Sequence, residues 1–247
     1  MRALLTGDFR FNPQWFAWLI ASADAYDLII FGGDILDTQS RIGLSKQIVR
    51  ASAILRTVAN KRPTVICSGN HDAVDQPAHT AAGVRPSWLD LLANASRMAS
   101  DGQSFVFANR LTVTVLGYLT DLPQKRTQLR EGKQLREASN TRWLVVHHHP
   151  PGFSANVGPE ECAAGQLLEE FSPTVWCSAR YFRQPYRRGF CGQEKIGNTI
   201  VINLAQARLD GTRSTGPVPN HVTWNLESNQ LSWSDFRAVP DELLRCR

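Results

Sequence analysis

Residues 64–72 read Thr-Val-Ile-Cys-Ser-Gly-Asn-His-Asp, a short apolar run that ends in a glycine and three polar side chains. The run has the length and the β-branched content of a buried strand. An amide oxygen, an imidazole and a carboxylate at the end of a strand are the groups that metal-assisted phosphoryl transfer uses. The same residues also form ordinary turns, because Asn and Asp tolerate left-handed backbone. The choice between the two interpretations depends on the motifs in the rest of the sequence.

Three other apolar runs, residues 3–6, 28–31 and 144–146, also lead directly into polar side chains. Between the first three strands of this set lie segments of helical length, residues 13–25 and 44–59, which carry apolar residues at helical spacing. This β-α-β-α-β alternation predicts a parallel sheet. In such sheets the loops at the carboxyl ends of the strands form the active site.

The second half of the chain predicts a second sheet and two further helices. Its candidate strands, which resemble a meander, are residues 104–107, 111–115, 199–202, 222–224 and 230–233. Residues 121–140 and 159–171 are polar and suit solvent-facing helices. Residues 75–87 and 211–220 have the composition of loops. Because no repeat or low-complexity linker divides the sequence, we expect residues 1–247 to form one domain.

The composition excludes several classes of protein. A composition of 43% hydrophobic and 20% charged residues is typical of a folded globular protein and not of a disordered chain or a membrane protein. Gly7 and Asp8 come too early for a signal peptide, and no apolar run reaches membrane length. Five widely spaced cysteines without a C-x-x-C pair argue against a disulfide framework. We therefore expect a cytoplasmic protein that starts at residue 1 and has no membrane partner.

The polar motifs at the strand ends form an ordered set. In chain order they are Gly7-Asp8, Gly32-Gly33-Asp34, Gly69-Asn70-His71-Asp72 and His147-His148-His149-Pro150-Pro151. This set closely resembles the calcineurin-like metallophosphoesterases, whose motifs run Asp-x-His, Gly-Asp-x-x-Asp, Gly-Asn-His-Asp/Glu, a His-containing strand end and Gly-His-x-His. The resemblance covers residues 4–204. It implies an α/β fold, a two-sheet β-sandwich flanked by helices in four layers, α/β/β/α.

The resemblance also implies a metal site. Asp8 would be a terminal ligand of one metal, and Asp34 would bridge two. Asn70 and His148 would ligate the second metal. Carboxylate and amide oxygens combined with imidazole suit a divalent metal ion such as Mn, Fe or Zn.

Two further residues receive catalytic roles from the resemblance. His71 would face the leaving-group oxygen as an acid, and Asp37 would orient it. Asp72 would be a supporting or turn residue. Because neighbouring residues on a strand point to opposite faces, we expect either that His147 and His149 are bystanders beside His148, or that one histidine of the three acts while another supports it from the same side.

Two motifs depart from the family pattern. Asp8-Phe9-Arg10 stands in place of Asp-x-His, and Ser178-Ala179-Arg180-Tyr181 stands in place of Gly-His-x-His, so three imidazoles are missing. A guanidinium cannot ligate a metal, and at about 4 Å from a dication it is unfavourable by roughly 8 kcal/mol at an effective dielectric constant of about 20. We therefore expect one metal site rather than two. Arg10 and Arg180 would bind substrate phosphate instead.

The sequence thus predicts a metal-dependent hydrolase of phosphate mono- or diesters, acting on a phosphorylated small molecule or a nucleotide. The main alternative is a catalytically impaired protein that keeps the fold as a binding or scaffold module. A nuclease is the other alternative, because Arg180, Arg183, Arg187 and Arg188 form one basic group and the segment 125–136 forms another. Nucleic acid would then be the partner, with affinity that falls steeply with salt. The net charge of +5 favours anionic partners only mildly.

Overall fold

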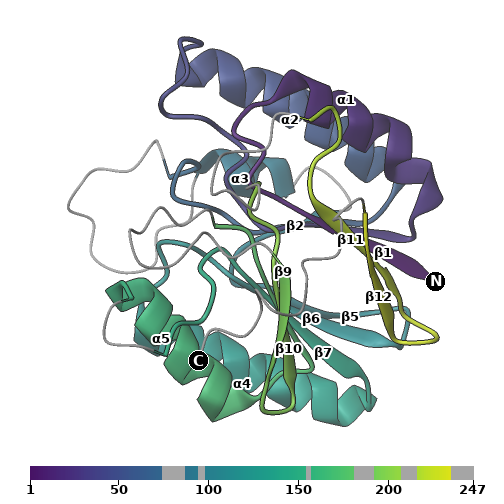
Figure 1. The fold of residues 1–247 in the computed structure, drawn as a ribbon, viewed down its shortest axis with the longest axis vertical. Helices are drawn as coiled ribbons and strands as arrows, with labels where there is room; N and C mark the ends of the chain where they lie inside the picture. Colours follow the sequence, from purple (N-terminus) through teal and green to yellow (C-terminus); the bar gives the residue numbers. More distant parts are fainter. Residues whose placement is uncertain (74–86, 94–97, 154–156, 181–191, 207–215, 235–247) are drawn as a thin grey trace, which may run out of the picture.

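The structure is a computed structural model that describes residues 1–73, 87–93, 98–153, 157–180, 192–206 and 216–234. Two six-stranded sheets pack face to face, and helices cover both outer faces (Figure 1). The predicted α/β sandwich in four layers is therefore confirmed. Most of the two predicted loops, residues 75–86 and 211–215, lie outside the described residues.

The first sheet has the strand order β12-β11-β1-β2-β3-β4. Its strands are β1 (Arg2–Thr6), β2 (Leu28–Phe31), β3 (Thr64–Ile66), β4 (Met98–Ala99), β11 (His221–Asn225) and β12 (Gln230–Trp233). β1 to β4 are parallel, and β11 pairs antiparallel with β1. Placing residues 222–224 and 230–233 in the second sheet was wrong. β11 joins the first sheet because Val222 and Trp224 pack into the core between the sheets beside β1.

The second sheet has the order β5-β6-β7-β8-β10-β9. Its strands are β5 (Ser104–Phe107), β6 (Leu111–Leu116), β7 (Arg142–His147), β8 (Val175–Ser178), β9 (Gly192–Ile196) and β10 (Thr199–Asn203). The four central strands are parallel, and β5 and β9 are antiparallel at the edges. The expected meander is therefore wrong for the centre of this sheet. The helices α4 and α5 make the parallel crossovers possible.

Helices α1 (Pro13–Ser22), α2 (Leu44–Lys61) and α3 (Ser87–Ala93) cover the first sheet, and α4 (Leu122–Ser139) and α5 (Pro159–Phe171) cover the second (Figure 1). A short 3₁₀ helix, η1 (Ala23–Ala25), follows α1. Asn12 Oδ1 caps α1 by accepting from the backbone N–H groups of Gln14 and Trp15. Asp121 caps α4 in the same way. Among the helices that the structure describes, none combines the length and apolarity of a membrane span.

Three apolar layers hold the sandwich together. Leu5 packs between the sheets with Val113 and Val146, whereas its neighbour Leu4 packs under α1 with Trp15. A third layer lies between the second sheet and helices α4 and α5. Strands buried on both faces read as unbroken apolar runs, which is why the sequence reveals them. Each such aliphatic side chain contributes roughly 1.5–3 kcal/mol by burial.

Small residues let the carboxyl ends of the two sheets come together. A Cβ atom on Gly7 would lie 2.5 Å from Ala179 Cβ, and one on Gly32 would lie 2.7 Å from the same atom. Gly7 follows β1, Gly32 follows β2 and Ala179 follows β8. Only glycine fits at such an approach. The loops after these strands therefore share one edge of the sandwich.

Candidate active site

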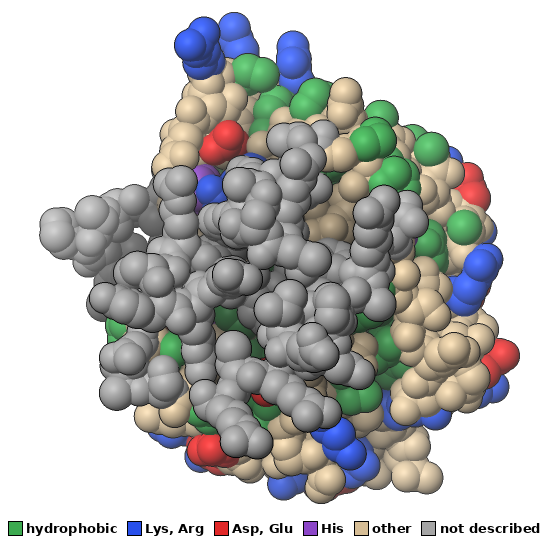
Figure 2. Space-filling model, in the orientation of Figure 1, with side chains coloured by type: hydrophobic (Ala, Val, Ile, Leu, Met, Phe, Trp, Pro, Cys, Tyr) green, Lys and Arg blue, Asp and Glu red, His purple; other side chains and the backbone are tan. Residues whose placement is uncertain are grey.

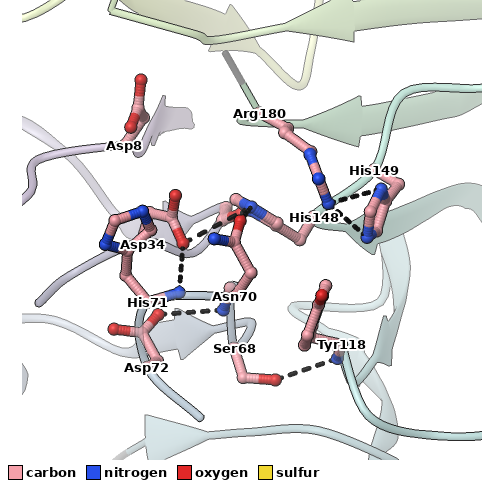
Figure 3. A network of polar contacts seen from close by, with 12 residues as sticks. Asp8, Asp34, Ser68, Asn70, His71, Asp72, Tyr118, His148, His149 and Arg180 are labelled. Atoms are coloured by element: carbon pink, nitrogen blue, oxygen red, sulfur yellow. Dashed lines mark hydrogen bonds and ion pairs between the residues drawn. The ribbon is translucent and has the colours of Figure 1, made fainter. Parts of the chain in front are cut away.

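Three of the predicted metal ligands meet at this shared edge. His148 Nε2, after β7, lies 3.1 Å from Asn70 Oδ1, after β3, and 3.4 Å from Asp34 Oδ1, after β2 (Figure 3). Asp34 and His148 are fully buried. The structure therefore brings side chains from both sheets into one small group.

The facing atoms of these three side chains have no hydrogen-bond donor among them. His148 Nδ1 donates to the backbone oxygen of Gly32 at 3.1 Å, and burial lowers the pKa of His148 to about 3. The ring is then neutral, and Nε2 carries a lone pair. Nε2 and the Oδ1 atoms of Asn70 and Asp34 are three acceptors that face one another. Asp34 Oδ1 also accepts from the backbone N–H of His71, but none of the three side chains donates to the other two. A divalent cation fits this mixture of oxygen and nitrogen ligands.

Asp34 itself has features of a functional carboxylate. Its Oδ1 accepts from the backbone N–H of His71 at 2.9 Å, and its buried Oδ2 has no hydrogen-bond partner among the described residues. Desolvation raises the pKa of Asp34, although His71, Arg10 and Arg180 act in the opposite direction. Its φ of 55° lies in the left-handed region, a strain that is common at functional sites. The carboxylate is thus held in place by one hydrogen bond, and its second oxygen has an ion pair with Arg10 at 3.4 Å.

Arg10 occupies the position between Asp34 and Asp8. Its Nε donates to Asp8 Oδ1 at 2.8 Å, and its Nη2 lies 3.4 Å from Asp34 Oδ2. The other oxygen of Asp8 accepts from the backbone N–H of Gln206 at 3.0 Å. Burial lowers the pKa of Arg10, but Asp8, Asp34 and Asp37 outweigh that effect and raise it overall. Asp8 therefore pairs with a permanent cation and lies apart from the three acceptors.

The described residues contain no group of three or more His, Cys, Asp or Glu side chains arranged to hold a metal ion. The three facing acceptors, on Asp34, Asn70 and His148, are called the acceptor group below. Only Asp34 and His148 are of these residue types. The third member of the group is the amide of Asn70. A cation at this site would depend on an uncharged oxygen as well as on the carboxylate and the imidazole.

His71 lies near its predicted partner but has another contact. Its Nδ1 accepts from the backbone N–H of Thr38 at 3.1 Å and lies 2.9 Å from Thr38 Oγ1. Asp37 Oδ1 is 3.8 Å from the same nitrogen, which is longer than a hydrogen bond. Because Nδ1 accepts, the ring proton is on Nε2. Thr38, which follows Asp37 directly, lies outside the motifs of the sequence.

Asp72 supports both loops of the site. Its Oδ1 accepts from the backbone N–H groups of Ile35 and Leu36, and its Oδ2 accepts from that of Gly69, each at 2.9 Å. Burial and the charge of Asp34 raise the pKa of Asp72, and these hydrogen bonds oppose the rise. The side chain thus links the loop after β2 to the loop after β3.

Arg180 lies on the other side of the acceptor group from Asp8 in Figure 3. Its Nη1 is 2.8 Å from His149 Nε2 and 3.0 Å from His149 Nδ1. Its charge lowers the pKa values of both Asp34 and His148. Tyr181, Arg183, Arg187 and Arg188 lie outside the described residues.

The two histidines beside His148 have their own partners. His147 Nδ1 donates to the backbone oxygen of His149 at 3.1 Å, and burial lowers the pKa of His147. His149 Nδ1 lies 2.8 Å from Glu161 Oε1. Burial lowers the pKa of His149 to about 4. Glu161, from α5, is a second residue that the strand-end motifs do not reveal.

Comparisons with known proteins agree with this architecture. The profile described as calcineurin-like phosphoesterase matches residues 2–179. No curated protein matches the chain. The structure of TT1561 of Thermus thermophilus is similar, with a TM-score of 0.64, 14% identity and coverage of 94% of this chain and 97% of that chain.

Two other solved structures are similar to this chain, with somewhat lower TM-scores. A purple acid phosphatase from yellow lupin (Lupinus luteus) seeds has a TM-score of 0.57 and 11% identity, covering 94% of this chain and 52% of that chain. A dimetal phosphatase from Danio rerio has a TM-score of 0.55 and 15% identity, covering 90% of this chain and 91% of that chain. At such identities the likeness shows the fold alone.

Proposed function

We propose that this chain, which belongs to the calcineurin-like phosphoesterase family, hydrolyses phosphate esters with one divalent cation and one arginine that takes the place of a second cation. The family is one of metal-dependent hydrolases of phosphate esters. The observation that supports the proposal most directly is the meeting of Asp34, Asn70 and His148, three acceptors without a donor between them.

These three side chains would hold the cation. Mn, Fe and Zn all accept such a mixture of ligands. When bound, the metal would neutralise charge on the phosphate oxygens and make a water molecule more acidic. Asp72 would keep Asp34 and Asn70 in fixed positions relative to each other, because it holds the backbones of both loops.

Arg10 would bind phosphate oxygens directly. Its side chain is 16% exposed, and its guanidinium is oriented by Asp8. A planar guanidinium is suited to two oxygens of one phosphate group. A second dication beside it would be disfavoured by roughly 8 kcal/mol at about 4 Å, for an effective dielectric constant of about 20. The pairing of Arg10 with both carboxylates therefore supports one cation rather than two.

His71 would stabilise the departing oxygen. With Thr38 donating to Nδ1, the imidazole offers its Nε2–H as a hydrogen-bond donor. Asp37, 3.8 Å from the ring, would favour any positive charge that develops on it. The sequence suggested that His71 acts as an acid. Here it would instead donate a hydrogen bond to the negative charge that develops on the departing oxygen.

A second candidate function is a binding module without turnover. The ion pair of Arg10 with Asp8 favours it, because a carboxylate predicted to hold a metal is already neutralised. Such a module would still bind phosphate groups through its arginines. It would not need Asn70 or His148 for chemistry.

Hydrolysis assays separate the two candidates. With added Mn²⁺, we expect the wild type to hydrolyse p-nitrophenyl phosphate or bis(p-nitrophenyl) phosphate. Asn70→Ala and His148→Ala should lower the Mn²⁺-dependent rate by about 100-fold or more, because metal affinity already falls about 10–100-fold when only an outer partner is lost. Asn60→Ala, an exposed position on α2, is the control. Equal rates in all four proteins would leave only the binding module.

A further inference from the structure

Helix α5 brings a buried carboxylate to the edge of the site. Glu161 is only 3% exposed, in the first turn of the helix. A Cβ on Gly165 would collide with the backbone oxygen of Gly152, so the helix lies directly against the segment that follows His149. The backbone N–H of Gly152 also donates to Glu161 O at 2.8 Å. These contacts fix the carboxylate beside the imidazole of His149.

His149 connects this carboxylate to Arg180. Its Nδ1 lies 2.8 Å from Glu161 Oε1, and Arg180 Nη1 lies 2.8 Å from its Nε2. A carboxylate has only acceptors, so Nδ1 donates its proton to Glu161. Arg180 Nη1 lies almost as close to Nδ1, at 3.0 Å, and so contacts both ring nitrogens. Arg180 Nε is also 3.8 Å from Glu161 Oε1. The buried negative charge and the arginine are therefore balanced across one ring.

Tyr118 attaches this cluster to the loop of the acceptor group. Its ring stacks on His149, with 5.2 Å between centroids and an interplanar angle of 14°. Its backbone N–H donates to Ser68 Oγ at 2.9 Å, and Ser68 lies two residues before Asn70 (Figure 3). Stacking and hydrogen bonding thus hold the ring of His149 in one orientation. That orientation determines where the guanidinium of Arg180 lies.

The geometry points to Arg180 as a ligand of a substrate phosphate oxygen, with Glu161 and His149 as positioning residues that hold its guanidinium at the site. The side chain of Arg180 is 25% exposed, so it is accessible to a ligand. In Figure 3, Asp8 lies to the left of the acceptor group and Arg180 to its right, and Arg10 pairs with Asp8 and Asp34. A phosphate group would then be contacted from two sides. This inference rests on the proposed function and adds how the phosphate is recognised.

Binding of inorganic phosphate tests the inference without turnover. Calorimetric titration of the Mn²⁺-loaded protein would compare wild type, Glu161→Gln, Arg180→Gln and the double variant. We expect each single change to weaken phosphate binding about tenfold, as for loss or misplacement of one charge-assisted hydrogen bond. The double variant should be no weaker than Arg180→Gln, because Glu161 acts through Arg180. In hydrolysis, Glu161→Gln should raise KM and change kcat little.

Glu160→Gln is the matched control, since Glu160 is the exposed neighbour of Glu161 on the same turn. It should bind phosphate like the wild type. Thermal unfolding of each variant shows whether the fold is retained, and Glu161→Asp should recover part of the affinity.

Three results would overturn the inference. They are equal phosphate affinity of Glu161→Gln and wild type, additive losses in the double variant, and a wild type that binds no phosphate. If the wild type hydrolyses esters while Glu161→Gln binds phosphate normally, only the positioning role fails. If the wild type neither binds phosphate nor hydrolyses esters, the proposed function fails as well.

Discussion

Arg10 is the residue that most changes the chemistry expected of this site. Its guanidinium bridges two buried carboxylates, Asp8 and Asp34, at the edge of the acceptor group. An arginine there supplies a fixed positive charge that cannot be removed by chelation or by an ordinary change of pH. The site is therefore polarised even before any metal binds.

Replacing Arg10 with glutamine should separate metal binding from phosphate binding. Without the guanidinium, Mn²⁺ should bind at least about tenfold more tightly, because a repulsive unit charge is gone. Inorganic phosphate should bind about tenfold more weakly, because a charge-assisted donor is lost. Calorimetric titration measures both, with Arg50→Gln, an exposed position on α2, as the control. An unchanged Mn²⁺ affinity would mean that Arg10 lies too far from the cation to matter.

Ala179 marks a second departure from the family pattern, and it lies at a tightly packed position. Its Cβ points at Gly7 and Gly32, in the contact between the sheet ends. We expect Ala179→His to lower the free energy of unfolding by about 1–3 kcal/mol, as overpacking does. It should not strengthen metal binding. Urea unfolding and Mn²⁺ titration check the two effects, and tighter Mn²⁺ binding would show that the side chain can reach the site.

Among the elements, the loops after β2 and β3 determine the geometry of the site. Asp72 accepts hydrogen bonds from both loops and is fully buried. An amide at this position would direct N–H groups at backbone N–H groups. We therefore expect Asp72→Asn to lower the free energy of unfolding by about 2–3 kcal/mol, the range for an unsatisfied buried group.

Urea unfolding checks the Asp72 prediction, with Glu169→Gln on the exposed face of α5 as a control that should leave stability unchanged. Mn²⁺ affinity should fall together with stability, because Asp34 and Asn70 lie on the two loops. Normal stability in Asp72→Asn would show that the loops are held by other contacts.

Local patterns were sufficient to predict most elements. The apolar runs of β1, β2 and β7, and the start of α1 at Pro13, are local signals that the structure confirms. β11 was misplaced because its pairing of Trp224 with Ala3 joins residues that are far apart in the sequence. β4 has only two residues, too few for a periodic signal.

At the candidate site, too, only residues with a local sequence signal could be predicted. Asp34, Asn70 and His148 could be found because each lies within four residues of the end of a strand with a readable apolar run. Thr38, Gln206 and Glu161 could not, because their contacts with His71, Asp8 and His149 depend on how loops and helix α5 pack. The roles of the predicted ligands stay predictions until binding is measured.

The molecule as a whole does not present one basic surface in the view of Figure 2, where Lys and Arg side chains lie in small separate groups. On α4, Arg126 Nε pairs with Glu170 at 2.9 Å, and Arg130 Nη2 lies 4.0 Å from the same residue. Such exposed pairs reduce the charge available to a polyanion. These pairs weaken the case for a nucleic-acid surface on α4, one of the two basic segments that the sequence offered for it.

The most direct test of this account is the metal content per chain after equilibrium dialysis against Mn²⁺. We expect one Mn²⁺ per wild-type chain and none in His148→Ala, because that change removes one of three ligands. Arg10→His, which exchanges the guanidinium for an imidazole, should bind a second Mn²⁺. Two tightly held ions in the wild type, or an unchanged content in His148→Ala, would contradict the account.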